Sequence, residues 1–124
     1  MTDKKRALIV EDEFLIAEGL RVQLDAIGMQ VCGIAATAEE AIDLAIEHRP
    51  DIVLMDVRLR GERDGVDAAL EIHDSVGSQV IFVTGSREQS TIDRIEKDHA
   101  AATLFKPVSA IQLKRTIDRV GGWV

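Results

Sequence analysis

Short apolar runs alternate with helical patterns along the whole chain, and this alternation restricts the fold more than any other feature of the sequence. The runs predict β-strands near residues 6–10, 30–34, 51–55, 79–83 and 102–105. Their nearly continuous apolarity is typical of strands that are covered on both faces. The pattern therefore predicts an α/β fold, in which helices pack on both faces of a five-stranded parallel sheet.

The segments between the predicted strands carry the patterns of amphipathic helices. A helix at about residues 13–27 has one apolar stripe and ends at Gly28. Thr37 and Ser109 each begin a capping-box pattern, because a Glu or Gln follows three residues later. A further helix is expected directly after Asp64 and the glycine that follows it.

The helix predicted at about residues 87–98 differs from the others. Its apolar stripe reduces to Ile92 and Ile95, and its other positions are charged or polar. A helix that buries little apolar surface is weakly attached, so this helix is a candidate for an element that moves. The alternative is that it simply occupies an exposed position on the fold.

Length and composition predict one domain over residues 1–124. A chain of 124 residues is long enough for a single core, and the alternating pattern leaves no room for a second domain. Only three Phe and one Trp are present, so the core must be built from Ile, Leu, Val and Ala.

The charge balance argues against two classes of partner. The formal net charge is −7 and no stripe of Lys and Arg stands out, which argues against direct binding of nucleic acid. No apolar run approaches the length of a transmembrane helix, and the run after residues 1–6 is too short for a signal peptide. We therefore expect a cytoplasmic protein that contacts no membrane. The single cysteine, Cys32, excludes an internal disulfide and is expected to be a buried, inert thiol.

Polar side chains follow four of the predicted strands, at the point where each strand ends. They are Glu11 and Asp12, Asp56, Thr84 and Lys106. The carboxyl ends of parallel strands form the crevice in which such sheets bind ligands. Each residue alone has an ordinary explanation, such as an acidic helix start or a polar strand end. Together, in these strands and in this order, they predict a site.

The chemistry of this site follows from its charges. Two like charges roughly 4 Å apart cost about 4 kcal/mol at an effective dielectric near 20, so three carboxylates require a cation. Oxygen ligands without a nearby His or Cys favour Mg²⁺, which would let a carboxylate act as nucleophile toward a phosphoryl group. Lys106 and Thr84 are expected to bind the phosphoryl oxygens. His48, His73 and His99 lack the spacing of metal ligands, and we expect them to be solvated surface residues.

In kind and order these residues resemble the receiver domain of two-component response regulators, over essentially the whole chain. The match comprises the acidic pair, the phosphoacceptor, the switch hydroxyl, the lysine and its cis-proline, which correspond here to Glu11 and Asp12, Asp56, Thr84, Lys106 and Pro107.

The resemblance implies a flavodoxin-like, doubly wound (βα)5 fold with strand order 2-1-3-4-5. It implies that Mg²⁺ is bound by Asp12, Asp56 and the backbone carbonyl of Arg58, with Glu11 as the other member of the acidic set. It also implies a signalling protein rather than an enzyme. Such a domain assists only the phosphorylation and dephosphorylation of its own aspartate.

The resemblance further implies the partners. The phosphoryl group would come from a sensor histidine kinase or a histidine phosphotransfer protein. A downstream protein partner would read the phosphorylated state from the surface made by the helix at 87–98, the strand at 102–105 and the last helix. We expect a monomer, or a weak dimer through that same surface.

The sequence departs from the family pattern at three places. The loop at 57–64 lacks the usual proline and is about one residue longer. Most receivers carry Tyr or Phe three positions before the lysine, where this chain has Thr103. Its aromatic residue is Phe105, which strand alternation places on the same face. The segment Phe-Val-Thr-Gly at 82–85 is similar to a subgroup with the motif Phe-Ala-Thr-Gly-x-Tyr, but Arg87 stands in place of the Tyr.

These departures bear on how a phosphorylated state would be read. Thr103 lacks the volume to fill the space behind a displaced Thr84, so the response is expected to come from the helix at 87–98. Arg58 and Ser86 lie two positions after the acceptor and the hydroxyl, and are expected to flank the path of the attacking water.

Two other functions fit parts of the pattern. A haloacid-dehalogenase-like phosphatase also uses Asp, Thr, Lys and Mg²⁺, but needs Asp-x-Asp after its first strand, whereas Asp56 follows the third and is followed by Val57 and Arg58. A receiver-like binding module that never accepts phosphate is the second alternative. The complete acidic set argues against it.

Overall fold

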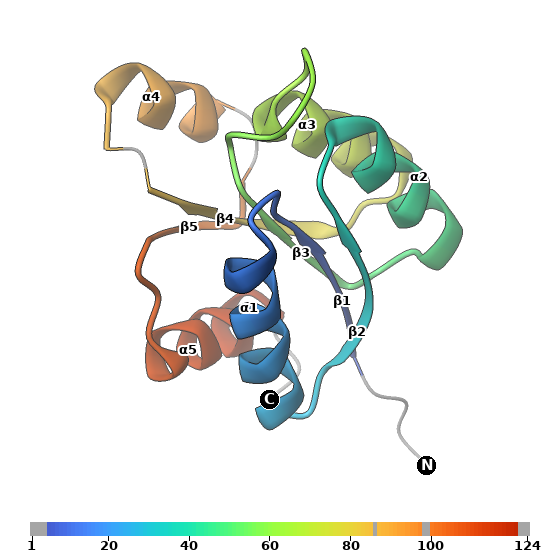
Figure 1. Cartoon of the computed structure of the whole chain (residues 1–124), viewed down its shortest axis with the longest axis vertical. Helices are drawn as coiled ribbons and strands as arrows, with labels where there is room; N and C mark the ends of the chain where they lie inside the picture. Colours follow the sequence, from blue (N-terminus) through green and yellow to red (C-terminus); the bar gives the residue numbers. More distant parts are fainter. Residues whose placement is uncertain (1–4, 86, 98–99, 122–124) are drawn as a thin grey trace.

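A five-stranded parallel sheet with helices on both faces forms the centre of the molecule (Figure 1). The structure is a computed structural model, and it describes residues 5–85, 87–97 and 100–121. The strands are β1 (Arg6–Val10), β2 (Gln30–Ala35), β3 (Ile52–Met55), β4 (Gln79–Thr84) and β5 (Ala102–Phe105). Their order is β2-β1-β3-β4-β5, so both the α/β class and the strand order are confirmed.

The helices divide between the two faces of the sheet. They are α1 (Phe14–Ala26), α2 (Ala38–His48), α3 (Gly65–Ser75), α4 (Gln89–Lys97) and α5 (Ala110–Gly121). In Figure 1, α1 and α5 cover one face, while α2, α3 and α4 cover the other. The predicted α1 was one residue too long at each end. The predicted α4 began two residues too early, and its last predicted residue, 98, lies outside the described ranges.

The core follows from the side-chain alternation of the central strands. On β1, Ala7 and Ile9 pack toward α1 and α5, whereas Leu8 and Val10 pack toward α2 and α3. All four side chains are at most 1% exposed. Strands that are buried on both faces need nearly continuous apolar sequence, which explains why the runs were recognisable.

Side-chain caps set where three of the helices begin. The Thr37 hydroxyl accepts from the Glu40 amide (3.1 Å), and the Ser109 hydroxyl accepts from the Gln112 amide (3.1 Å), as predicted. The capping box at Thr37 is only half formed, because the Glu40 carboxylate accepts from the amide of Ala36 (2.8 Å) rather than that of Thr37. A complete capping box, in which Asp64 and Asp67 each accept from the other's backbone amide, begins α3.

Two expectations about burial need correction, those for Cys32 and His48. Cys32 is half-buried rather than buried, because it lies on the edge strand β2, where its thiol donates to the Ala7 carbonyl (3.3 Å). Burial nevertheless raises the pKa of the Cys32 thiol, as expected of an inert cysteine. His48 is not a solvated residue, because its ring is half-buried with Nδ1 3.2 Å from Arg6. His73 is exposed, and His99 lies outside the described residues.

The reduced apolar stripe of α4 is present in the structure. Ile95 is 2% exposed and joins the core, whereas Ile92 is only half-buried. Over the described residues, none of the helices has both the length and the apolar character that crossing a membrane requires.

The start of α3 lies against the end of β3 with no space between the two backbones. The Gly65 amide donates to the Val57 carbonyl (2.7 Å), and a Cβ on Gly65 would lie 1.8 Å from the Asp56 carbonyl oxygen. Gly65→Ala must therefore displace backbone, and we expect the free energy of unfolding to fall by about 2 kcal/mol or more in urea denaturation.

Gly19 on α1 provides the matched control for this prediction. A Cβ on Gly19 meets nothing within 4 Å, so Gly19→Ala should raise the free energy of unfolding by about 1 kcal/mol through helix propensity. A Gly65→Ala variant as stable as the wild type would show that the close packing at Asp56 is not a constraint.

Candidate functional site

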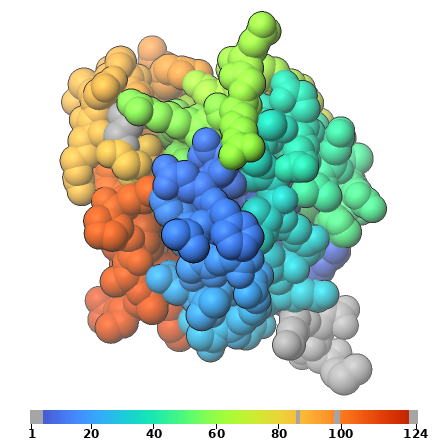
Figure 2. Space-filling view, viewed as in Figure 1, coloured from blue at the N-terminus to red at the C-terminus, as the bar shows by residue number. Residues whose placement is uncertain are grey.

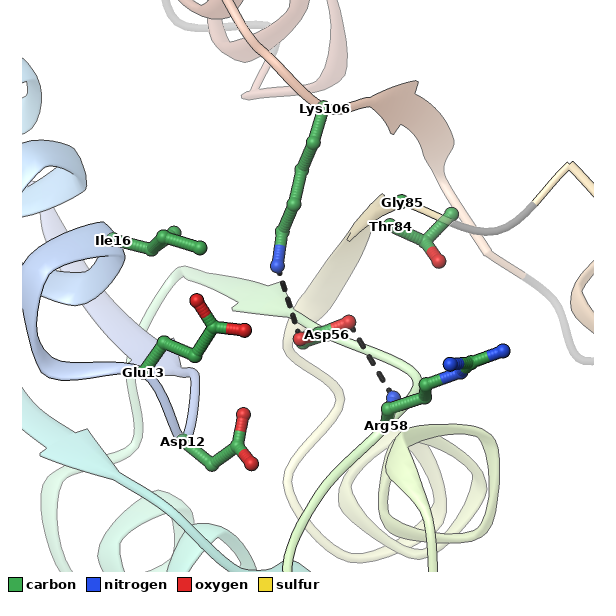
Figure 3. Close-up of a pocket in the computed structure, with 8 residues that line it drawn as sticks. All are labelled: Asp12, Glu13, Ile16, Asp56, Arg58, Thr84, Gly85 and Lys106. Atoms are coloured by element: carbon green, nitrogen blue, oxygen red, sulfur yellow. Dashed lines mark hydrogen bonds and ion pairs between the residues drawn. The ribbon is translucent and has the colours of Figure 1, made fainter.

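An open cleft of about 390 Å³ lies at the carboxyl ends of β1, β3, β4 and β5 (Figure 3). It is lined by Asp12, Glu13, Ile16, Asp56, Arg58, Thr84, Gly85 and Lys106. The structure thus brings together the polar residues that follow the four strands. Of the predicted acidic pair, Asp12 lines the cleft, whereas Glu11 is buried, 3% exposed, and contacts Lys106.

The carboxylates are positioned by continuation of the strand ladders. The Glu11 amide donates to the Ala35 carbonyl (2.8 Å), and the Asp56 amide donates to the Val10 carbonyl (2.9 Å). One carboxylate oxygen from each of Glu11, Asp12 and Asp56 lies within 4.8 Å of the others. Asp56 is buried, 7% exposed, and lines the cleft.

Lys106 comes from the far end of the sequence and neutralises part of this charge. Its Nζ lies 2.6 Å from Glu11 Oε1 and 3.1 Å from Asp56 Oδ2, and Figure 3 shows it reaching across the cleft to Asp56. Its backbone is held by the Thr84 carbonyl (2.9 Å), and the following bond to Pro107 is cis. Burial alone would lower the pKa of Lys106, but the Glu11 and Asp56 carboxylates outweigh it and raise that pKa. The lysine therefore keeps its charge.

Glu11 has the opposite balance. Burial is the largest cause that raises the pKa of Glu11, and the charge of Asp56 adds to it. The hydrogen bonds from Lys106 and from the Glu13 amide (3.1 Å) oppose this without cancelling it. At Glu11, burial and the charge of Asp56 therefore outweigh the stabilisation that the Lys106 ammonium gives to the ionised carboxylate.

The donor set of this cluster fits a hard divalent cation. The three groups that could ligate the cation are all carboxylates, those of Glu11, Asp12 and Asp56. The cleft beside them is open to water. Arg58, the fourth predicted ligand, donates its amide to Asp56 Oδ1 (3.4 Å) while its side chain is 80% exposed. The role of the Arg58 carbonyl as a metal ligand stays a prediction.

The predicted switch residues lie on neighbouring strands. Thr84 is 1% exposed and pairs in register with Phe105, while Thr103, half-buried, pairs with Phe82. The guanidinium carbon of Arg87 lies 4.4 Å from the centroid of the Phe105 ring, a cation–π contact. The position of this arginine in the sequence motif gave no sign of that contact. Ser86 lies outside the described residues.

Sequence reasoning missed two residues of the cleft. Glu13 and Ile16 line its wall on the side of α1 (Figure 3). Ile16 was assigned to the apolar stripe of the helix, but it is only half-buried. Their position in the sequence could have predicted this, because both follow the acidic pair within about one helical turn and so lie near the end of β1.

Comparison with known proteins gives a consistent result. Residues 7–118 match the family described as the response regulator receiver domain. The transcriptional regulatory protein PdtaR of Mycobacterium tuberculosis is 37% identical over 114 residues, and the polar-differentiation response regulator DivK of Brucella anthropi is 33% identical over 116 residues. Among solved structures, the signal receiver domain of a modulated diguanylate cyclase from Desulfovibrio desulfuricans G20 is 38% identical with a TM-score of 0.92.

The extent of these matches differs between relatives. The match covers 92% of this chain but only 55% of PdtaR, about half of that protein. It covers 91% of this chain and 93% of DivK. For the solved receiver domain, it covers 97% of this chain and 95% of that one. The prediction of one domain over 1–124 stays a prediction.

The crowded carboxylates should cost stability when no divalent cation is present. Charges about 5 Å apart repel by about 3 kcal/mol at an effective dielectric of 20, and the partial exposure of Asp12 reduces this. We expect Asp12→Asn to raise the free energy of unfolding by about 1 kcal/mol in urea with EDTA.

The control is the same substitution at an exposed aspartate on α2. Asp43→Asn should change the free energy of unfolding by less than about 0.5 kcal/mol. If Asp12→Asn instead destabilised the protein, the repulsion inferred for the cleft would be wrong.

Proposed function

Because this chain belongs to the family of response regulator receiver domains, we propose that it accepts a phosphoryl group on Asp56 from a histidine kinase or a histidine phosphotransfer protein. Receiver domains are signalling modules that interact with such donors. The observation that carries the proposal is the placement of the Asp56 carboxylate in the cleft, 3.1 Å from the Lys106 ammonium and beside Asp12.

The residues divide the chemistry as follows. An Asp56 oxygen attacks the phosphorus atom, the bond from phosphorus to the donor nitrogen breaks, and that nitrogen keeps the electron pair. Lys106 stabilises the negative charge on the phosphoryl oxygens, and the Thr84 hydroxyl donates to one of them. Gly85 leaves open space beside the reacting group, because a Cβ there would meet nothing within 4 Å.

The same site suits a bound Mg²⁺. Asp12, Asp56 and the Arg58 carbonyl would hold the ion, with Glu11 as the buried member of the acidic set. When bound, Mg²⁺ would neutralise phosphoryl oxygens as they approach three carboxylates. Lys106 contacts both Glu11 (2.6 Å) and Asp56 (3.1 Å), and so helps to orient Asp56 toward the cleft.

We propose that a downstream partner reads the phosphorylated state on the surface of α4, β5 and α5, and that this surface also forms any weak dimer. Thr84 and Phe105 are register partners on β4 and β5. A displacement of Thr84 toward the phosphoryl group would therefore change the packing at Phe105 on β5. Arg87, between β4 and α4, stacks on Phe105 and links this strand to the start of α4. The small, polar Thr103 leaves α4 as the element that responds.

Phosphorylation should require both Asp56 and a divalent cation. Intact mass after incubation with acetyl phosphate and Mg²⁺ should show one added phosphoryl group on the wild type and none on Asp56→Asn. Asp74→Asn, on the exposed surface of α3, should be labelled like the wild type. Excess EDTA should abolish labelling. Equal labelling of Asp56→Asn would exclude Asp56 as the sole acceptor.

Arg58 should control the lifetime of the phosphorylated state. Its side chain borders the cleft, is 80% exposed and is paired only at 4.0 Å with Glu88, so it can turn toward the phosphoryl group and shield it from water. We expect Arg58→Ala to lose its phosphoryl group about 2- to 5-fold faster, the effect of one exposed charge contact. Arg60→Ala, a change of the same kind in the same loop, should leave the rate unchanged. An unaltered rate for Arg58→Ala would remove this residue from the water path.

A further inference from the structure

Helix α4 is attached to the rest of the fold by an arginine as well as by its short apolar stripe. Arg94 Nη1 lies 2.7 Å from Asp64 Oδ2, and Nη2 lies 3.2 Å from Asp64 Oδ1, so the guanidinium grips both carboxylate oxygens. Nη2 also lies 3.7 Å from Asp67. Paired contacts of this kind fix orientation as well as distance.

Asp64 is itself held rigidly at the start of α3. Its Oδ1 accepts from the amides of Val66 (3.0 Å) and Asp67 (3.1 Å), and its own amide donates to Asp67. Burial would raise the pKa of Asp64, but the bonds from Arg94 and from these amides outweigh it and lower that pKa. The carboxylate that Arg94 binds therefore stays ionised and cannot rotate without breaking the cap.

The next residue joins this cap to the phosphoacceptor. The Gly65 backbone packs so closely on the Asp56 carbonyl that no side chain fits between them. Its amide also donates to Val57, which is 6% exposed (2.7 Å). A displacement of the backbone at Asp56 must therefore move the first turn of α3 with it.

We infer that the Arg94–Asp64 pair tethers α4 to the phosphoacceptor, so that α4 follows the backbone of Asp56 through Gly65 and the α3 cap. This inference rests on the proposed function, since it concerns how phosphorylation of Asp56 would reach α4. It is separate from the contact between Thr84 and β5. In this chain, which has Thr103 in place of a large residue, the tether gives the phosphoacceptor a second connection to α4, besides the one through Thr84 and β5.

A second, weaker contact joins the β3–α3 loop to the segment before α4, and phosphorylation could break it. Arg58 Nη2 lies 4.0 Å from Glu88, and these side chains are 80% and 69% exposed. Figure 2 shows the β3–α3 loop, in green, against the gold segment that leads into α4. A phosphoryl group, with a charge near −2, competes with Glu88 for Arg58. Loss of the Arg58–Glu88 contact, with the Arg94–Asp64 contact kept, would let α4 pivot about Arg94. The position of α4 would then differ between the phosphorylated and unphosphorylated states, as a switch requires.

The test is hydrogen exchange of the α4 amides, with and without Mg²⁺ and beryllofluoride as the phosphoryl mimic. Arg94→Gln and Asp64→Asn should each speed exchange of residues 89–97 about threefold or more in the unliganded protein, because each breaks the ion pair. Asn is as good a helix cap as Asp, so Asp64→Asn should leave α3 intact. The double variant should add little to either single one. The mimic should alter α4 exchange in the wild type much more than in Arg94→Gln.

Lys97→Gln is the matched control, because it removes the same charge from an exposed position on the same helix. Its α4 exchange and its response to the mimic should equal those of the wild type. If Arg94→Gln gave the wild-type exchange and the wild-type response, the tether would be excluded. If Arg94→Gln failed to fold, the ion pair would instead be weakened in the wild type with high salt. Hydrogen exchange of α4 that did not change with salt would equally exclude the tether.

Intact mass with acetyl phosphate separates this inference from the proposed function. Arg94→Gln should still be labelled on Asp56 as fully as the wild type, because Arg94 does not line the cleft. An unlabelled wild type would refute the proposed function, while the exchange of α4 in the unliganded variants would still measure the tether. A labelled wild type whose α4 responds identically in Arg94→Gln would refute the tether alone.

Discussion

The ammonium of Lys106 between Glu11 and Asp56 is the interaction on which the site depends. Glu11 is buried, and the cluster places three carboxylates within 4.8 Å of one another. Without the lysine, the ends of β1 and β3 would carry like charges with no internal counter-charge. The lysine follows β5, at the edge of the sheet opposite β2, so the site joins residues from the carboxyl ends of β1, β3 and β5.

The conflict between stability and function is concentrated at this same point. Elsewhere the sheet is covered by closely packed apolar side chains, whereas the acidic cluster brings like charges together at its edge. Three neighbouring carboxylates would favour a divalent cation, in line with the Mg²⁺ site that we propose.

Much of this was predictable from the sequence because it depends on periodic or positional signals. Buried parallel strands need continuous apolar runs, and their carboxyl ends must share one edge, so Asp56 and Lys106 were expected to meet. The contacts of Arg87 with Phe105 and of Arg94 with Asp64 were not predicted. Long side chains on exposed surfaces leave no periodic signal, and their partners depend on how the elements lie in space. The half-exposed Cys32 was missed for a related reason, because an apolar run does not distinguish an edge strand from a central one.

The β3–α3 loop combines fixed ends with an exposed tip. At one end, Arg60 pairs with Thr37 in a short parallel bridge, and at the other, Gly65 packs on the end of β3. Between them Gly61, with φ of 95°, and Glu62 are exposed. The exposed tip has room for an additional residue, whereas the contacts of Arg60 and Gly65 hold the rest of the loop in place. Such a loop can vary in length between relatives, and can carry a reporter group in the laboratory, while the carboxylate it follows stays in place.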